Sequence, residues 1–545
     1  MNSLSKAIRL TKKEKAILYL CAGLIAFVVF ALIHGLSILN PLYTDWLLLK
    51  GDKPQNYIGA QAYRQSAWFF PIGNLNTLRY PDFSSIIFTD SIPLLAVFYK
   101  LLRPILPFPF QYIGLWTLLC YVLQAFLAVK ILLKYVRHPE LVLLGTVFFL
   151  VSPVMIFRLF DHWSLGGHWV MLLAALLPLY YEEKYSNLKN VLPLVALLGV
   201  LTPGIHIYFC VNCGIIIGFY CLYDLTKQKK ILRPVCVMLL YLACALLTTY
   251  LLGGFDSEEV AQAGGLGLFS YNLNGLFNSQ GYSNIFPGMG MLWGQYEGFA
   301  YLGLGIMILL VPAIVYGIIQ IREKKASRTL IILSVLFALL CTIAAASNII
   351  TFGDTTLVNI PLPGFVRKVW GVFRASGRFI WPLFYLLVFA AVTGTARLLG
   401  RRAGALLLAV CLAVQCFDLY PFMSSRFVPG DRVYTSPLEE SKWTELVEKE
   451  GIEHLVLVGN AENEEALIQI EYDLGYFAIL HNLTLNRFRM SHSQFPYMDR
   501  VFEAVESFDP GNLFLFLDAA EAEEYSYALD LFPLDGFCAG LAKKQ

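Results

Sequence analysis

Long, uninterrupted apolar blocks are the feature of this sequence that most restricts its fold. Most run for about 18–24 residues, the length that carries an α-helix across a bilayer core of about 30 Å. Apolar residues are continuous within each block instead of alternating, which favours helices over a β-barrel. The blocks cover residues 16–33, 112–133, 141–157, 169–181, 191–223, 231–252, 301–319, 330–346, 381–399 and 403–419. We therefore predict an α-helical polytopic membrane protein with about 11–12 transmembrane helices, two of them within 191–223.

The composition agrees with this prediction. The chain is 57% hydrophobic and 15% charged, whereas soluble domains average about 25% charged residues. A net charge of +2 gives no indication of a nucleic-acid partner. Cys538 is the only one of the 11 cysteines outside the apolar blocks and their borders, so neither a disulfide framework nor a metal cluster is expected. Cys210 and Cys213 are interpreted as two small buried residues.

Basic clusters between the blocks predict the orientation, because lysine and arginine concentrate on the cytoplasmic side of membrane proteins. The clusters lie at residues 6–15, 130–137, 227–233, 322–328 and 397–402. They place the N-terminus in the cytoplasm and the C-terminal tail on the outer side of the membrane, with the first block kept as an uncleaved anchor. The polar segments then expected outside are 157–168, 202–206, 253–298 and 347–377.

Residues 86–107 conflict with this orientation if they cross the membrane. The segment is apolar, but it contains Asp90, Lys100 and Arg103 together with three prolines. A full span here would invert every later segment. We therefore expect a half-inserted or interfacial helix pair on the outer face, which is tolerated where protein covers the free backbone groups.

The chain is expected to divide into a membrane domain, residues 1–420, and a soluble extracytoplasmic α/β domain, residues 421–545. Large outer loops at 38–85 and 253–298 interrupt the membrane domain. In the tail, HLVLVGN and NLFLFLD are typical of short buried strands. The acidic stretches AENEEAL and AAEAEEYSYAL favour helices. No internal repeat, low-complexity tract or glycine-rich nucleotide loop is evident in the sequence.

Three carboxylates follow the first apolar block and are candidate catalytic residues. Asp45 would lie at the outer membrane surface, and Asp52 and Asp90 come later in the same region. Each is able to act as a general base for a hydroxyl acceptor or as a metal ligand. The alternative is a solvated loop acid or, for Asp90, a helix N-cap before a proline. Arg64, in the same loop, is a candidate substrate-binding residue.

The motif FRLFDHWSLGGHW gathers polar residues at the end of a predicted span. Arg158 lies close to the membrane, where a guanidinium favours an anionic partner. Asp161, His162 and His168 are able to bind a polar substrate, and their spacing matches no strong metal-ligand signature. His206, in TPGIHIYF, is a further candidate, with a satisfied intramembrane histidine as the alternative.

The stretch LFNSQGYSNIFPGMGMLWGQYEGFAYLGLG is rich in glycine, asparagine, tyrosine and tryptophan. Amides and hydroxyls bond to sugar hydroxyls, and aromatic rings pack on the apolar faces of pyranoses. Gln295, Tyr296 and Glu297 are the candidate substrate-binding residues here. An ordinary loop is the alternative interpretation.

Four cations in PGFVRKVWGVFRASGRFIWP lie on the predicted outer side, where cations are disfavoured. Besides Arg367 and Lys368, they are Arg374 and Arg378, whose i, i+4 spacing predicts one shared helix face. Two guanidiniums on one face form a good pocket for a phosphate or diphosphate. The alternative is contact with lipid headgroups by snorkelling side chains.

These features together resemble the GT-C superfamily, integral membrane glycosyltransferases that use polyprenyl-phosphate-linked sugars. FRLFDHWSLGGHW, GQYEGFAYLGLG and FRASGRFIWP also look like segments of a bacterial multi-pass branch of such proteins. The resemblance covers roughly residues 11–420. It implies that Asp45 is the first-loop acid, with Asp52 or Asp90 as a second acid, and that Arg374 and Arg378 bind the lipid phosphate.

The activity implied by this resemblance is transfer of a sugar from a polyprenyl-phosphate donor to an envelope glycan, lipid or polymer on the outer face. A divalent cation is compatible with this chemistry but not required, because the arginine pair can neutralise the leaving group. The alternatives left open are a lipid-linked glycan polymerase or ligase, a transporter or flippase, and a non-catalytic scaffold for envelope assembly. Membrane lipids are the other expected partners.

Overall fold

The computed structural model describes residues 10–49, 51–255, 266–461, 463–490 and 509–543. Lys6 and Arg9 of the N-terminal basic cluster lie outside the described residues, as does the side chain of Lys368. The chain forms two compact units. The helical unit comprises Met1–Asn40, Tyr112–Leu246 and Gln262–Gly430, and the loop–tail unit comprises Pro41–Gln111, Leu247–Ala261 and Asp431–Gln545.

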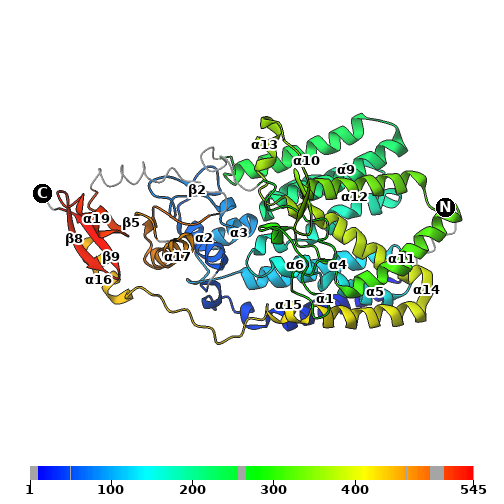
Figure 1. The fold of residues 1–545 in the computed structure, drawn as a ribbon, viewed down its shortest axis with the longest axis horizontal. Helices are drawn as coiled ribbons and strands as arrows, with labels where there is room; N and C mark the ends of the chain where they lie inside the picture. The colour runs from blue at the N-terminus through cyan, green and yellow to red at the C-terminus, as the bar shows by residue number, and fades with distance from the viewer. Residues whose placement is uncertain (1–9, 50, 256–265, 462, 491–508, 544–545) are drawn as a thin grey trace. The chain divides into compact units, whose positions relative to one another are not determined.

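Nine helices among the described residues are long and apolar enough to cross a membrane, so the chain is a multi-pass α-helical membrane protein, as its apolar blocks predict. Several of them, including α4, α5, α9, α11, α12 and α14, form one bundle (Figure 1). The helices in these spans are α1 (Lys12–His34), α4 (Ile113–Leu133), α5 (Pro139–Leu150) continued by α6 (Pro153–Arg158), α8 (Leu188–Ile205), α9 (Tyr208–Gln228), α10 (Leu232–Leu251), α11 (Leu304–Arg322), α12 (Arg328–Ala346) and α14 (Trp381–Asp418), which follows the 3-10 helix η7 (Ser376–Ile380).

Helix α14 contains the two spans that the blocks 381–399 and 403–419 predict. Gly400 has φ 70° and ψ −158°, a conformation that interrupts the helix. A Cβ atom on Gly404 would lie 3.7 Å from the Cα of Ala396. Residues eight apart in a straight helix are separated by about 12 Å along its axis. The chain therefore reverses at Gly400, and the two halves of α14 pack as antiparallel helices.

Two shorter apolar segments differ from the nine long helices. Residues 86–107 contain the 3-10 helix η3 (Ile86–Phe88) and the nine-residue helix α3 (Pro93–Leu101). As predicted, this segment holds no helix long enough to span a membrane. The block 169–181 forms α7 (Trp169–Leu179), of 11 residues, followed by a π-helix over Tyr181–Tyr185. That α7 crosses the membrane stays a prediction.

The tail contributes a mixed five-stranded sheet to the loop–tail unit, in the order β6-β5-β7-β9-β8. The strands β6, β5 and β7 are parallel, and β9 pairs antiparallel with both β7 and β8. The two predicted strands, HLVLV and NLFLF, pair with each other at the centre of the sheet and are confirmed. The strands are β5 (His454–Val458), β6 (Thr484–Leu485), β7 (Asn512–Phe516), β8 (Leu529–Leu534) and β9 (Phe537–Ala542).

The helices of the tail follow the sequence prediction in part. AENEEAL leads into α17 (Glu464–His481), as predicted. The prediction for AAEAEEYSYAL is wrong beyond its first turn, because α19 (Ala519–Glu523) is short and β8 begins at Leu529. Leu529 is 1% exposed and packs with Val456 and Phe514, so its burial in the sheet core overrides the local helix propensity.

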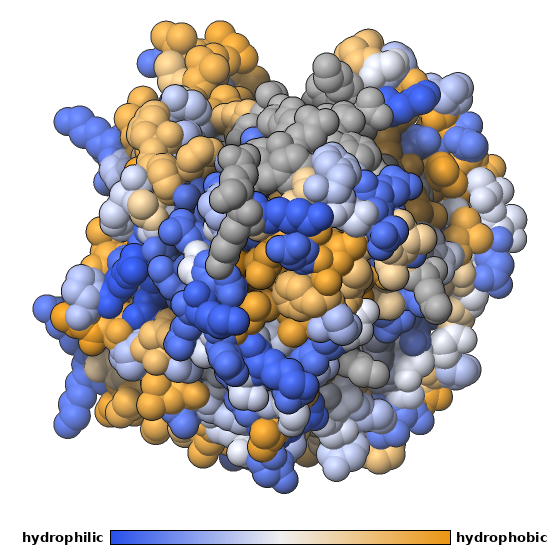
Figure 2. Space-filling model, turned by 90° about the vertical axis from the view of Figure 1, so that its left-hand side faces the viewer, coloured by the Kyte–Doolittle hydropathy of each residue, from blue (hydrophilic) through white to orange (hydrophobic). Residues whose placement is uncertain are grey.

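The first loop packs against the tail within the loop–tail unit. Here α2 (Lys53–Gln65) lies against α17, and the Leu485 N–H donates to the Thr77 carbonyl at 2.9 Å. A short hairpin, β1 (Asn74–Leu75) with β2 (Ser84–Ser85), belongs to the same loop. The face shown in Figure 2 carries hydrophilic residues around a central apolar area, with further apolar residues along its rim.

Candidate functional site

Glu297 is the centre of a buried ionic cluster in the helical unit. Its Oε2 atom accepts hydrogen bonds from Arg158 Nη2 at 2.6 Å and from Arg378 Nε at 3.0 Å. Arg378 Nη2 lies 2.9 Å from the same oxygen. Exposure is 2% for Arg158, 6% for Glu297 and 8% for Arg378. The structure thus joins three of the predicted candidates, which come from three separate segments of the sequence.

Each member of the cluster lies where a regular element begins or ends. Arg158 is the last residue of α6, and Arg378 lies in η7 directly before α14. Glu297 lies in the 3-10 helix η6 (Gln295–Gly298), which follows Gly294 at φ 86°. The carbonyl of Glu297 also accepts from Arg158 Nη2 at 2.9 Å, so one guanidinium orients both the backbone and the side chain of the acid. The ends of these elements therefore fix the positions of the three charged side chains.

The cluster carries excess positive charge. Although burial alone would raise the pKa of Glu297, the charges of Arg158 and Arg378 lower it below its ordinary value, with a smaller contribution from His162. Glu297 is therefore ionised at neutral pH. One carboxylate facing two guanidiniums leaves one positive charge uncompensated within the cluster. A buried excess of this kind favours an anionic ligand.

Arg374 and Arg378 do not share one helix face, which corrects the prediction from their i, i+4 spacing. Helix α13 (Gly364–Gly371) ends before Arg374, and Arg378 lies in η7. Between them the Ala375 N–H donates to the hydroxyl of Tyr208 at 2.7 Å instead of continuing a helix. This hydrogen bond from the backbone N–H to a side-chain hydroxyl takes the place of the i to i−4 backbone hydrogen bond that a continuous helix would form.

Tyr208 nevertheless keeps the two arginines in one region. The Arg378 guanidinium lies 4.4 Å from the centroid of the Tyr208 ring, and both Arg374 and Arg378 interact electrostatically with the Tyr208 side chain. Arg374 is exposed, and its guanidinium lies 4.7 Å from the ring centroid of Phe269. Sequence analysis missed Tyr208 and Phe269, although Tyr208 stands two residues after the candidate His206.

The remaining candidates of the segments FRLFDHWSLGGHW and TPGIHIYF differ in their surroundings. Some are partly exposed, and one is buried with a structural partner. His162 and Asp161 are partly exposed, and Asp161 interacts electrostatically with Arg426. His206 follows α8, and its ring lies 5.3 Å from that of Tyr208. His168 is fully buried and pairs through Nδ1 with the hydroxyl of a tyrosine in α14 at 2.8 Å, which indicates a structural role.

Gln295 and Tyr296 differ in accessibility. Gln295 is 2% exposed, and its amide donates to Thr351 Oγ1 at 2.7 Å and accepts from Asn272 Nδ2 at 2.8 Å. These hydrogen bonds hold segments of the helical unit together, so Gln295 has a structural role. Tyr296 is 41% exposed, so of these two residues it is the one that a ligand could reach.

Arg426 is a buried cation that sequence analysis also missed. It follows the short helix α15 (Tyr420–Ser424). Its guanidinium lies 4.4 Å from the ring centroid of Phe160 and 4.7 Å from that of Phe422. Burial lowers its pKa from the ordinary value, partly opposed by Tyr282 and Asp161. A cation held by aromatic faces outside the predicted motifs gives no signal in the sequence.

The three candidate acids lie in the loop–tail unit. Asp45 begins the 3-10 helix η2 (Asp45–Leu47), and its Oδ2 accepts the backbone N–H of Tyr434 at 3.1 Å. Asp52 directly precedes α2. Asp90 is 6% exposed at φ 57° and is not the N-cap of α3, because Ile92 occupies that position.

Asp52 and Asp90 both interact electrostatically with Tyr472 of α17. Burial, and then the negative charge of Asp52, raise the pKa of Tyr472 well above its ordinary value, with a smaller contribution from Asp90. The hydroxyl of Tyr472 is buried and has no hydrogen-bond partner among the described residues. Asp45 instead interacts with Tyr476, one turn further along α17. The sequence did not choose between Asp52 and Asp90 as the second acid, and since both act electrostatically on Tyr472, the choice stays open.

Metal binding finds limited support in this arrangement. Among the described residues, no group of three or more histidine, cysteine, aspartate or glutamate side chains has a geometry that could hold a metal ion.

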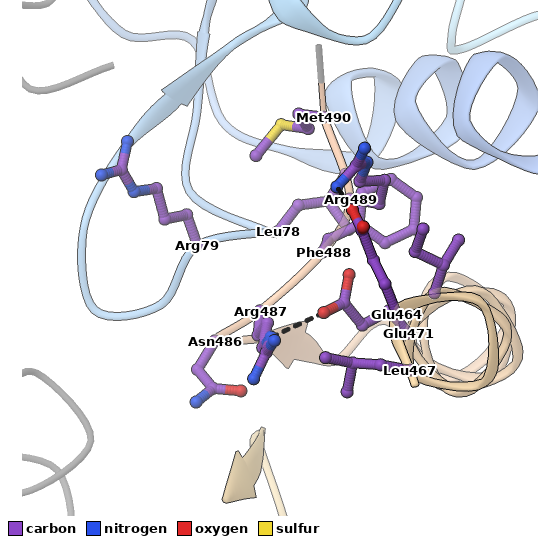
Figure 3. Close-up of a pocket in the computed structure, with 11 residues that line it drawn as sticks. Leu78, Arg79, Glu464, Leu467, Glu471, Asn486, Arg487, Phe488, Arg489 and Met490 are labelled. Atoms are coloured by element: carbon purple, nitrogen blue, oxygen red, sulfur yellow. Dashed lines mark hydrogen bonds and ion pairs between the residues drawn. The ribbon is translucent and has the colours of Figure 1, made fainter. Parts of the chain in front are cut away.

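A polar cavity of about 220 Å³ lies in the loop–tail unit (Figure 3). Arg487 Nε donates to Glu471 Oε1 at 2.6 Å, and Arg489 Nη1 donates to Glu464 Oε1 at 2.8 Å. Arg79 adds a third guanidinium to the lining. Burial raises the pKa of Glu471 despite the opposing charge of Arg487. Ion-paired arginines and carboxylates in a cavity of this size suit a polyhydroxylated or anionic ligand.

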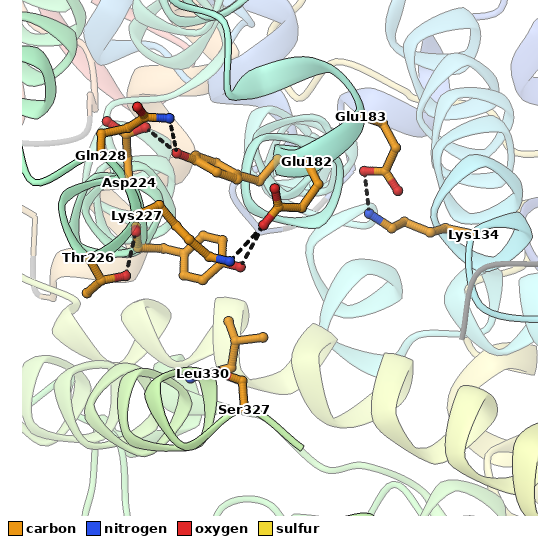
Figure 4. Close-up of polar contacts among 11 residues, drawn as sticks. Lys134, Glu182, Glu183, Asp224, Thr226, Lys227, Gln228, Ser327 and Leu330 are labelled. Carbon is orange, nitrogen blue, oxygen red and sulfur yellow. Dashed lines mark hydrogen bonds and ion pairs between the residues drawn. The ribbon is translucent and has the colours of Figure 1, made fainter. Parts of the chain in front are cut away.

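Ion pairs at the predicted cytoplasmic ends of the helices have a structural role (Figure 4). Lys134 pairs with Glu183 at 2.8 Å, next to the carboxyl end of α4. Asp224 is fully buried in α9 and pairs with Arg233 of α10 at 2.8 Å. These pairs tie neighbouring helices together at the ends where the sequence predicts basic clusters.

The chain belongs to the family described as "Domain of unknown function (DUF6311)", whose model matches residues 23–420. No curated protein matches the chain. Among solved structures, archaeal oligosaccharyltransferase AglB from Archaeoglobus fulgidus, in complex with an inhibitory peptide and a dolichol-phosphate, is similar at 11% sequence identity and a TM-score of 0.46. The similarity covers 97% of this chain and 75% of that chain. A likeness this distant defines neither the fold nor the function of the present chain.

Proposed function

We propose that this member of a family of unknown function is a membrane glycosyltransferase that moves a sugar from a polyprenyl-phosphate donor to an envelope glycan, lipid or polymer. The observation that carries the proposal is the cluster of Arg158, Glu297 and Arg378, with the exposed Arg374 nearby. It supplies excess positive charge at the ends of membrane-spanning helices, the depth at which the phosphate of a membrane-anchored donor lies.

Arg374 and Arg378 are the proposed ligands of the donor phosphate. Guanidiniums bind phosphate oxygens through charge-assisted hydrogen bonds. In the reaction, the acceptor oxygen bonds to the anomeric carbon while the bond from that carbon to the phosphate oxygen breaks. The phosphate leaves with the electron pair, and the arginines stabilise the charge that develops on it. Glu297 and Arg158 hold Arg378 in a fixed orientation.

A carboxylate of the first loop is proposed to receive the proton of the acceptor hydroxyl. Asp45 is the candidate base, because it lies in the first loop soon after the first span and is half-buried. Asp52 and Asp90, beside Tyr472, are the candidate second acids. The polar cavity lined by Arg79 and Arg487 is the proposed binding place for the acceptor. A divalent cation is not required for this chemistry.

The proposal includes a location and an orientation. The basic clusters support a bacterial plasma (inner) membrane with a cytoplasmic N-terminus and an extracytoplasmic tail. The donor then binds at the outer leaflet, where membrane lipids surround the helical unit. A lipid-linked glycan polymerase or ligase that shares the arginine site but takes a longer donor is the nearest alternative.

A transporter or flippase is less well supported. Transporters place ionisable groups near the bilayer midplane, commonly in helices that are broken there. Among the described residues of the helical unit, the buried charged side chains instead lie at or near helix ends, as Arg158, Asp224 and Asp418 do. This placement favours chemistry at a membrane surface over passage through the bilayer.

Donor binding tests the arginine site. Purified protein in nanodiscs is titrated with polyprenyl phosphate, and the bound lipid is counted by native mass spectrometry. We expect Arg374→Ala and Arg378→Ala each to weaken binding by at least about tenfold, the effect of losing one charge-assisted contact. Arg402→Ala, at an exposed arginine beyond the Gly400 turn, is the matched control and should bind as the wild type does. Equal binding by all three variants would remove the support for this site.

A further inference from the structure

The first loop presents an apolar face at the surface of the loop–tail unit. Along α3, Leu94, Phe98 and Leu101 recur at the spacing of one helix face, and they are 38%, 51% and 63% exposed. Ile105, in the turn after α3, is 76% exposed. Trp68, in the loop after α2, is 49% exposed. A continuous apolar face on a helix too short to span a membrane requires a covering partner.

Three cations lie at the edge of this face. Arg64 is 6% exposed and Lys100 is 3% exposed, whereas Arg103 is exposed. Lys100 Nζ lies 3.9 Å from the ring centroid of Tyr63 and 4.6 Å from that of Trp68. Trp68 therefore joins the apolar face to the cations.

The three cations donate hydrogen bonds to backbone carbonyls, and no carboxylate pairs with them among the described residues. Lys100 Nζ donates to the Ala67 carbonyl at 3.1 Å, and Arg103 Nη1 donates to the Gln65 carbonyl at 2.8 Å. Arg64 Nη2 donates to a third carbonyl at 2.8 Å, and its buried Nη1 has no hydrogen-bond partner among the residues that the structure describes.

The positive charges also act on one another. Burial and then the charge of Arg103 lower the pKa of Lys100 to about 8. Burial, and then the charge of Arg103, also lower the pKa of Arg64 from its ordinary value. Carbonyls at or just after the end of α2 accept from Lys100 and Arg103, and a carbonyl after α3 accepts from Arg64. They leave the net charge of the group uncompensated, so an external anion would stabilise it.

We propose that the exposed face of α3 lies in the membrane interface and that Arg103, backed by Lys100 and Arg64, binds the headgroup phosphate of an anionic phospholipid. Apolar side chains beside an indole ring and basic residues are the pattern of a helix that lies in the headgroup region. The apolar face contacts the acyl chains, and the cations lie at the depth of the phosphates. This inference holds whether or not the chain transfers sugars.

Photo-crosslinking of the full-length protein tests the proposal. Phe98→benzoylphenylalanine is reconstituted in vesicles of phosphatidylglycerol and phosphatidylethanolamine at a fixed ratio, and the phospholipid adducts are identified by mass. Tyr527→benzoylphenylalanine is the control, because Tyr527 is 70% exposed in the tail. We expect phospholipid adducts at position 98 and almost none at position 527.

The headgroup preference tests the role of the cations. Adding Arg103→Gln to the Phe98 variant should lower the ratio of phosphatidylglycerol to phosphatidylethanolamine adducts by about fivefold, the effect of one basic residue near an anionic membrane surface. Arg103→Lys should keep the ratio. Capture of protein in place of lipid at position 98, equal adducts at both positions, or a ratio that Arg103→Gln leaves unchanged would overturn the proposal.

Discussion

Glu297 is the residue on which the arginine site depends most. Replacing it by glutamine keeps the shape of the side chain but removes the negative charge that Arg158 and Arg378 share. Removing one partner of a buried ion pair costs about 3–5 kcal/mol. We expect Glu297→Gln to lower the thermal stability of the detergent-solubilised protein strongly. Glu323→Gln, at an exposed glutamate beside Lys325, is the control and should have little effect.

The same residue gives a pH dependence with a defined sign. The folded-state pKa of Glu297 lies below its ordinary value, so its ionised form stabilises the fold at pH values above that ordinary value. This contribution is lost only as the pH falls through the lowered pKa. The stability difference between wild type and Glu297→Gln should therefore persist from pH 8 to pH 5. A difference that disappears near pH 6 would contradict the ionic role of Glu297.

Sequence reasoning identified the members of this cluster but not their pairing. Arg158, Glu297 and Arg378 were each recognisable as polar residues beside apolar blocks. That Glu297 binds both arginines depends on how three distant segments pack, which no local pattern contains. The predicted shared helix face of Arg374 and Arg378 failed for a related reason, since the Tyr208 hydroxyl took the backbone N–H of Ala375.

The helices themselves were largely predictable, because their lengths follow from the thickness of the bilayer. The turn at Gly400 is the clearest structural requirement within them. A residue with a Cβ atom at φ 70° costs about 1–3 kcal/mol. We expect Gly400→Ala to destabilise the protein by about this amount in thermal unfolding. Gly317→Ala is the matched control, because Gly317 lies inside α11 with open space around it, and alanine there should be neutral or stabilising.

The short helix α3 decides how many times the chain crosses the membrane. A reporter enzyme active only outside the cytoplasm, fused after Phe108, should be active if residues 86–107 stay on the outer side. The same reporter fused after Lys229, in a predicted cytoplasmic cluster, should be inactive. Activity of a cytoplasmic reporter at Phe108 would instead show that the segment crosses.

At the scale of the whole molecule, the sequence predicted a multi-pass membrane domain followed by an α/β tail. The sheet of the tail was foreseeable from HLVLV and NLFLF, whose apolar runs are too short for spanning helices. The packing of α2 against α17 was not foreseeable, because it joins segments about 400 residues apart and depends on side-chain fit. The polar cavity was missed for the same reason, since its lining residues come from the first loop and from the tail.

The most direct test of the account is cleavage of the donor. Protein in vesicles is supplied with sugar-loaded polyprenyl phosphates extracted from its host membranes, together with an envelope acceptor fraction, and release of free polyprenyl phosphate is measured. The account predicts release by the wild type, and a loss of about a hundredfold or more in both Asp45→Asn and Arg378→Ala. Arg402→Ala should retain the wild-type rate. Release at the wild-type rate by both Asp45→Asn and Arg378→Ala, or none by the wild type, would contradict it.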